Sequence, residues 1–181
     1  YEDMASIIDM EPARQKDWLR SDISLVQAKV DNIRFKETKQ KEPQLDIHYT
    51  IESSQYGNKT GKRLFITVNI FHKGFYRPSN QGERTQDIQI NYGYLDIDSL
   101  NIRLPEGYEI ESLPKTTDME TKFGKFHSSI TLEEGGNILI VHRLLFHQGN
   151  YPKEDNTDFM DFRKNVATQY AAKIIVKKSG E

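Results

Sequence analysis

The side chains that could do chemistry in this chain are histidines, aspartates and serines, because its 181 residues include no cysteine. That absence excludes a thiolate nucleophile, a disulfide and cysteine-ligated zinc. Asp96 and Asp98 flank Ile97, so in an extended chain both carboxylates lie on the same side. Such a pair could bind calcium or act as acid and base. The simpler interpretation, which we adopt, is a polar strand face at the edge of a sheet.

The histidines show no spacing typical of a metal site. His142 and His147 are five residues apart on one predicted strand, so they point to opposite faces and cannot chelate one ion. His142 stands between Ile140 and Leu144, which predicts a core histidine held by a hydrogen bond. We therefore expect no metal and no cofactor.

Serine and aspartate motifs for catalysis are also missing. The chain has no G-x-S-x-G sequence, and Ser128 and Ser129 follow His127 directly within a predicted strand, which is the wrong geometry for a triad. Three aspartates gather at the start of a predicted helix, where we expect two of them to serve the helix cap and the positive end of the helix dipole: Asp155, Asp158 and Asp161. The sequence predicts that this chain is not an enzyme.

Aromatic side chains in predicted turns and near a strand end are the candidate ligand-binding residues. Such aromatics can stack on sugar rings or anchor a partner. They could equally fill the ends of a sandwich or pack against a neighbouring domain. The candidates for a glycan or peptide site are Tyr56, Phe75, Tyr76, Tyr92 and Tyr94.

Charge and hydropathy exclude two classes of partner. The 25 basic and 27 acidic residues are interspersed and give a net charge of −2, which argues against nucleic acid or an anionic membrane as the main partner. No apolar run approaches the ~18 residues of a membrane span, so none is predicted. No signal peptide is visible, and the chain opens at Tyr1 in the middle of a pattern. We interpret it as part of a longer protein.

Period-two alternation dominates the chain. Apolar residues alternate strictly over 45–51 and recur over 64–70, which predicts half-buried strands. Residues 128–146 predict a hairpin in which Gly135-Gly136 forms a type I′ turn, and this turn would place Ser128 opposite Arg143. The second strand of that hairpin is apolar on both faces and should be central in its sheet.

Two helices complete the predicted fold. Pro12 suits the first turn of a short helix over 13–20, and an apolar stripe predicts a second helix over about 157–170, followed by a strand over 173–178. The fold class is therefore mainly β: an antiparallel β-sandwich of about nine strands with a short N-terminal helix and one C-terminal helix packed on the sheet. Residues 1–20 are predicted to form a lead-in segment and residues 21–181 the β-sandwich domain.

Two short motifs stand out in the chain, LPEGYEIESLP at 104–114 and FGKF at 123–126. They are accompanied by Arg14 with Trp18-Leu19, Pro43 with Tyr49, Pro78 with Glu83-Arg84, GNYP at 149–152, a helix with Phe159, Phe162 and Arg163, and KIIVKK at 173–178. In this order and spacing, the motifs resemble the C-terminal β domain of the transglutaminase-like proteins of Bacteroidetes, a family of largely unknown function.

The resemblance implies a non-catalytic accessory domain beside an upstream transglutaminase-like core, with a structural role or a role in presenting substrate or partner. It implies a periplasmic, extracellular or cell-envelope setting. Its expected partner is the upstream domain of the same polypeptide. The alternative is a carbohydrate- or peptide-binding module that uses the loop aromatics.

Overall fold

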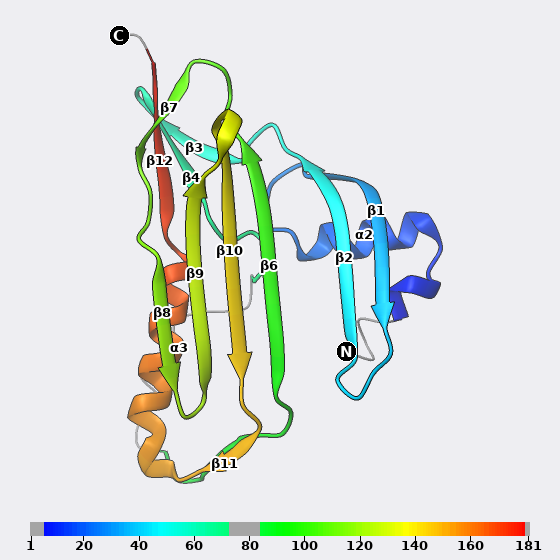
Figure 1. Cartoon of the computed structure of the whole chain (residues 1–181), viewed down its shortest axis with the longest axis vertical. Coiled ribbons are helices and arrows are strands. Elements are labelled where there is room, and N and C mark those ends of the chain that lie inside the picture. The colour runs from blue at the N-terminus through cyan, green and yellow to red at the C-terminus, as the bar shows by residue number, and fades with distance from the viewer. Residues whose placement is uncertain (1–5, 73–83, 180–181) are drawn as a thin grey trace. The chain divides into compact units, whose positions relative to one another are not determined.

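The computed structural model describes residues 6–72 and 84–179. The chain divides into two compact units (Figure 1). Unit 1 comprises Tyr1–Tyr56 and Ile70–Lys73, and unit 2 comprises Gly57–Asn69 and Gly74–Glu181. The expected division at residue 20 stays a prediction.

Unit 1 consists of helical turns and one long hairpin. The 3₁₀ helix η1 (Ser6–Asp9) precedes α2 (Pro12–Asp22), which begins with proline at its first turn as predicted. The Gln15 side-chain amide donates to the carbonyl oxygens of Ile7 and Ile8, at 3.0 and 3.2 Å. The antiparallel pair β1 (Lys29–Thr38) and β2 (Gln44–Glu52) follows, and β2 confirms the strand expected from the alternation over 45–51.

Unit 2 contains two four-stranded antiparallel sheets, which confirms the mainly β fold. The first sheet has the order β6-β10-β9-β8, and the second has the order β3-β4-β12-β7. A short pair, β5 (Ile88–Ile90) with β11 (Gly149–Tyr151), lies at one end. The described residues form twelve strands rather than about nine, because three of them, β3, β5 and β11, are only three or four residues long.

Three strands of the first sheet have nine or ten residues, whereas its edge strand β8 and the strands of the second sheet have four to six. The first sheet comprises β6 (Tyr94–Arg103), β8 (Thr117–Thr121), β9 (Gly124–Leu132) and β10 (Asn137–Phe146). The second comprises β3 (Gly57–Thr60), β4 (Arg63–Thr67), β7 (Tyr108–Ser112) and β12 (Lys173–Lys178). As predicted, β10 is central in its sheet and a strand occupies 173–178.

The β9–β10 hairpin differs by one residue from its predicted register. Leu132 pairs with Ile138, so Ser128 lies opposite His142 and not opposite Arg143. Glu133 donates its backbone N–H to the carbonyl of Asn137 at 2.8 Å, which leaves three residues in the loop in place of a two-residue type I′ turn. The turn includes η2 (Glu134–Gly136), and both of its glycines have positive φ.

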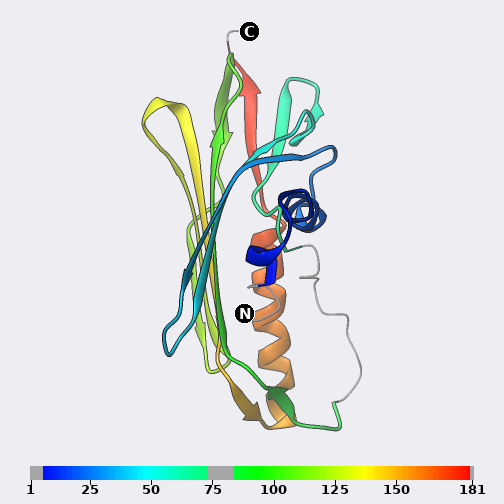
Figure 2. The same ribbon diagram turned by 90° about the vertical axis from the view of Figure 1, so that its right-hand side faces the viewer.

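Helix α3 (Asn156–Tyr170) covers one face of the first sheet and confirms the predicted C-terminal helix (Figure 2). A short 3₁₀ turn, η3 (Lys153–Asp155), leads into it. The sheet and the helix share one aromatic-rich core, in which Phe146 contacts Phe162 and Phe126 contacts Tyr170 edge to face, with ring centroids 5.6 and 5.5 Å apart. This core comprises Ile88, Phe123, Phe126, Leu144, Phe146, Phe162, Val166 and Tyr170.

Candidate functional site

A serine, a histidine and an aspartate form a row across the first sheet. Ser128 on β9 lies opposite His142 on β10, and His142 lies opposite Asp98 on β6. Directly opposed residues share one face of an antiparallel pair, so all three face the side that α3 covers. Sequence reasoning missed this row because the predicted register placed Ser128 opposite Arg143. The hairpin loop length was the signal that would have revealed it.

Two members of the row are sealed in the core, whereas Asp98 is half-buried. Ser128 and His142 are each only 2% exposed. The Nε2 atom of His142 lies 3.2 Å from the carbonyl oxygen of Val68. Since a carbonyl can only accept, Nε2 carries the proton in this hydrogen bond and cannot act there as a base toward a serine hydroxyl. The arrangement confirms the prediction of a hydrogen-bonded core histidine.

Two carboxylates and two phenol groups lie in or beside this row, near the edge strand β6. Asp96 and Asp98 are half-buried on β6, the edge strand that their alternation suggested. Burial raises the pKa of Tyr170 far above its ordinary value, and the nearby carboxylates of Asp98 and Asp96 raise it further. Burial also raises the pKa of Tyr94, helped by Asp96. These phenols therefore stay protonated at neutral pH, and their rings pack against Phe146 and Phe126.

The candidate stacking residues differ in their surroundings. Tyr92 is 82% exposed, whereas Tyr94 is 44% exposed and its ring lies 5.3 Å from that of Phe146. The hydroxyl of Tyr56, in unit 1, is buried and has no hydrogen-bond partner among the residues that the structure describes, and burial raises its pKa. Phe75 and Tyr76 lie outside the described residues. A stacking site built from all five aromatics stays a prediction.

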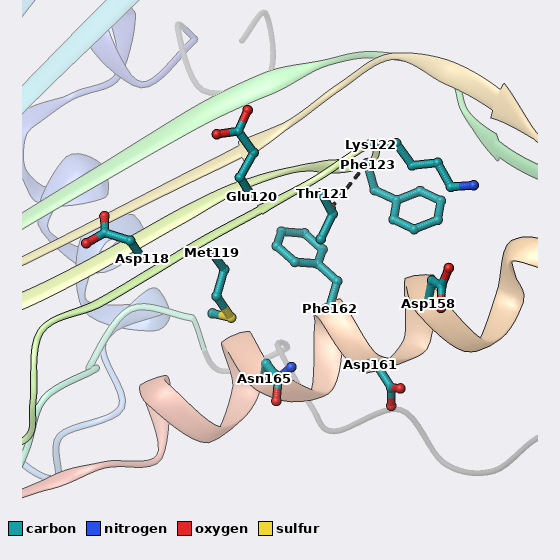
Figure 3. A pocket seen from close by; sticks show the side chains of 10 residues that line it. All are labelled: Asp118, Met119, Glu120, Thr121, Lys122, Phe123, Asp158, Asp161, Phe162 and Asn165. Atoms are coloured by element: carbon teal, nitrogen blue, oxygen red, sulfur yellow. Dashed lines mark hydrogen bonds between the residues drawn. The ribbon is translucent and has the colours of Figure 1, made fainter.

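A groove of about 720 Å³ opens between strand β8 and helix α3 (Figure 3). This volume falls within the range of roughly 300–1,000 Å³ typical of ligand sites. Met119 and Thr121 project from β8 toward the helix, and Phe162 projects from the helix toward the strand (Figure 3). The groove is lined by Asp118, Met119, Glu120, Thr121, Lys122, Phe123, Asp158, Asp161, Phe162 and Asn165.

The FGKF sequence, residues 123–126, holds the strand side of the groove in place. Phe123 is fully buried, and its ring centroid lies 5.1 Å from that of Phe159 and 4.8 Å from that of Tyr151. Gly124 approaches β10 so closely that a Cβ there would overlap the carbonyl oxygen of Leu145. The tight turn between β8 and β9 is therefore anchored against both the helix and the central strand, which fixes where β8 ends.

The charges around the groove are mostly negative. Lys122 is engaged by Asp155, with Nζ 2.6 Å from Oδ1. On β8, Asp118 pairs with His127 and Glu120 pairs with Lys125. Asp158 and Asp161 are exposed on α3, and no ion pair of either is found among the described residues. These two carboxylates give the helical wall its charge.

Within residues 6–72 and 84–179, no three His, Asp or Glu side chains are grouped so that they could hold a metal ion. No helix there has the length and hydropathy needed to cross a membrane.

The comparisons with known proteins give one family and one solved structure. The family model for a domain of unknown function with a solved structure (DUF3858) matches residues 62–176. A crystal structure from Parabacteroides distasonis ATCC 8503 at 2.00 Å resolution, described as that of a "putative protease", matches with a TM-score of 0.53 and 11% sequence identity. At this identity the likeness shows the fold alone. The match covers 64% of this chain and 23% of that chain. No curated protein matches significantly.

Proposed function

The chain belongs to the DUF3858 family of domains of unknown function, and from this premise we propose that it is a non-catalytic accessory domain that presents a substrate or partner to another domain of the same polypeptide. The proposal includes a transglutaminase-like core as that other domain and a cell-envelope setting. Both come from the resemblance of LPEGYEIESLP and FGKF to the β domains of such proteins.

The groove between β8 and α3 is the observation that carries this proposal. It is open, lined by apolar and acidic side chains, and bounded by a sheet edge and a helix. Such a surface can hold part of another molecule beside a catalytic centre. The sealed state of Ser128 and His142 supports a role without chemistry of its own, because neither side chain can reach a substrate.

The test compares two variants of the full polypeptide that carries this domain. Turnover of fluorescein-labelled casein is measured for Ser128→Ala and for Asp158→Asn/Asp161→Asn. A presenting role predicts that Ser128→Ala keeps both kcat and KM, whereas the groove variant raises KM and keeps kcat. Loss of kcat in Ser128→Ala would assign the chemistry to this domain and contradict the proposal.

A labelling experiment covers the case in which casein is not the substrate. A fluorophosphonate reacts with activated serine hydroxyls, and the modified tryptic peptide is identified by mass spectrometry. We expect no label on Ser128 in the folded protein, because the hydroxyl is buried and the imidazole opposite is hydrogen-bonded to Val68.

A second candidate function is glycan or peptide binding through exposed aromatics. The observation in its favour is the high exposure of Tyr92 beside the partly exposed Tyr94. The face of an exposed tyrosine ring can stack on a sugar ring. This alternative places the ligand at the start of β6. Substitutions of Tyr92 and Tyr94 therefore distinguish it from ligand binding in the groove.

A further inference from the structure

The edge strand β8 and the acidic wall of α3 together indicate a ligand class for the groove. We propose that the groove binds an extended basic polypeptide segment, which adds to β8 as an antiparallel strand and places one Lys or Arg side chain at Asp158 and Asp161. This inference rests on the proposed presenting role and deepens it. It is carried by three features: an open sheet edge, a helix that faces it, and their charges.

The backbone of β8 offers an unused edge. The strand is the last in the order β6-β10-β9-β8. Thr121 pairs with Gly124 across the two-residue turn Lys122-Phe123. The two residues that flank a two-residue hairpin loop form a hydrogen-bonded pair of the ladder. Hydrogen-bonded and non-hydrogen-bonded pairs alternate along an antiparallel ladder. The backbone groups of Asp118 and Glu120 therefore point away from β9 and can pair with an added strand, as in peptide recognition by strand addition.

The side chains of β8 fix which ligand residues enter the groove. Met119 and Thr121 face α3, so ligand residues directly opposite them face α3 as well. These two ligand residues are two positions apart, or about 7 Å. In Figure 3, Asp158 and Asp161 lie on the Thr121 side of the groove and Asn165 lies on the Met119 side, so the ligand residue opposite Thr121 is the one nearer to the two carboxylates.

The helical wall favours a cationic side chain on the ligand residue opposite Thr121. Asp158 and Asp161 are separated by three residues, or about 4.5 Å along the helix axis. This spacing is shorter than the ~7 Å between same-face side chains of a strand, and side chains three residues apart on a helix are neighbours, so one long cationic side chain of the ligand is within the field of both carboxylates. Because Lys122 is engaged by Asp155, the groove itself supplies no lysine to neutralise them. The second position, over Met119, favours an apolar side chain.

The charge of β8 itself disfavours a second copy of this chain as the occupant. If two β8 strands paired antiparallel about Met119, Asp118 of one would lie opposite Glu120 of the other. Like charges directly opposite destabilise a strand pair. Acidic side chains on an edge strand are a recognised protection against self-association. The same charges attract a basic segment.

The test uses fluorescein-labelled peptides of the sequence Gly-Thr-Lys-Thr-Val-Thr-Gly, with Lys opposite Thr121 and Val opposite Met119. A matched peptide carries Glu in place of Lys. Fluorescence anisotropy is measured at about 50 mM salt, since exposed charge pairs are screened at higher ionic strength. We expect the Lys peptide to bind about tenfold more tightly than the Glu peptide. In Asp158→Asn/Asp161→Asn this ratio should fall below about twofold.

Two controls separate charge from position and from backbone pairing. Glu134→Gln removes one exposed carboxylate in the β9–β10 loop, away from the groove, and should keep the tenfold ratio. N-methylation of the two Thr residues that flank Val removes N–H groups that face β8 and should weaken binding at least about tenfold. N-methylation of Lys and Val removes N–H groups on the opposite edge and should change affinity little.

Several results would overturn the inference. They are equal binding of the Lys and Glu peptides, no binding of either at 1 mM, or equal effects of the two N-methylated peptides. A dimer in sedimentation velocity that Glu120→Pro abolishes would assign the edge to a second copy. The peptide experiments test which ligand the groove binds, and the casein comparison tests whether the domain presents a substrate at all. If the peptides fail and the casein comparison succeeds, the domain has the presenting role but binds another ligand.

Discussion

The Nε2 atom of His142 lies 3.2 Å from the carbonyl oxygen of Val68, which is 74 residues earlier in the chain. Val68 directly follows β4 in the second sheet, and His142 lies at the middle of β10 in the first. The bond therefore ties the two four-stranded sheets of unit 2 together. The imidazole also packs against Tyr170 of α3, with ring centroids 5.3 Å apart at 84°.

Replacement of His142 by Leu should destabilise the protein. The carbonyl of Val68 would lose its hydrogen-bond donor in the core, which costs about 1–3 kcal/mol. The edge-to-face contact between the imidazole and the ring of Tyr170 would also be lost. We expect the free energy of unfolding in urea to fall by about 2 kcal/mol. His127→Gln is the control, because His127 lies on the other face of the same sheet in a solvent-exposed pair with Asp118. Equal stability of His142→Leu and the control would show that the Val68 bond contributes nothing.

Gly124→Ala should destabilise the β8–β9 turn. The added Cβ would overlap the carbonyl oxygen of Leu145, which belongs to the central strand and cannot move freely. Overpacking of this kind costs about 1–3 kcal/mol, and we expect the upper part of that range. Gly135→Ala is the comparison, because a Cβ there meets open space. Only the positive φ of Gly135, 81°, disfavours alanine at this position, and it should lower the free energy of unfolding by roughly 1 kcal/mol. Urea denaturation of both variants measures the difference.

The bridge between Arg63 and Glu111 should make stability depend on pH. The guanidinium donates from Nε to Oε2 at 2.6 Å and from Nη2 to Oε1, so it connects β4 to β7 across β12. These hydrogen bonds, together with the positive charges of Arg63 and Lys177, lower the pKa of Glu111 below its ordinary value of 4.5. A lowered folded-state pKa gives a contribution that is present above 4.5 and is lost as pH falls through the folded value.

Comparison of Glu111→Gln with the wild type at two pH values tests this dependence. The variant should have a slightly lower Tm at pH 7, and the difference should shrink as the pH falls from 4.5 through the lowered folded-state pKa, because the wild-type carboxyl then becomes protonated. Glu109→Gln is the matched control on the same strand. Glu109 makes a single ion pair with Lys177, at 3.1 Å, whereas Glu111 accepts two hydrogen bonds from Arg63. A Tm difference for Glu111→Gln that stays constant with pH would contradict the assignment.

The sequence predicted the elements with strong local signals. Pro12 and the apolar stripe Phe162, Val166 and Tyr170 marked the two helices, because helix starts and helical faces depend on near neighbours. Residues 137–146 are apolar on both faces, and the strand is central in its sheet as expected.

The candidate site depended on information that no local pattern contains. Strand β8 has one apolar residue, Met119, so its sequence gives no alternation, and its position at a sheet edge follows only from topology. The row of Ser128, His142 and Asp98 depended on a hairpin loop with one residue more than the Gly-Gly turn requires. A one-residue error changes every cross-strand neighbour, so the histidine itself was predicted correctly while its partners in the row were not.

Substitutions of Tyr92 and Tyr94 distinguish an exposed binding residue from a packing residue. Tyr92 is 82% exposed, so Tyr92→Ala should change the free energy of unfolding by less than about 0.5 kcal/mol. Tyr94 contacts Phe146 at 5.3 Å, so Tyr94→Ala should cost about 1 kcal/mol or more. Urea denaturation measures both.

The same two variants test the glycan-binding alternative. If Tyr92 stacks on a sugar ring, intrinsic tyrosine fluorescence titrated with cello-oligosaccharides or peptidoglycan fragments should show saturable binding that Tyr92→Ala weakens about tenfold, since stacking contributes through the exposed ring face. Tyr94→Phe, which keeps the ring and removes the hydroxyl, should keep the affinity. Saturable binding that neither Tyr92→Ala nor Tyr94→Ala changes would place the sugar elsewhere. An absence of binding in the wild type would leave Tyr92 as an exposed residue without this role, and the groove beside β8 as the candidate site of unit 2.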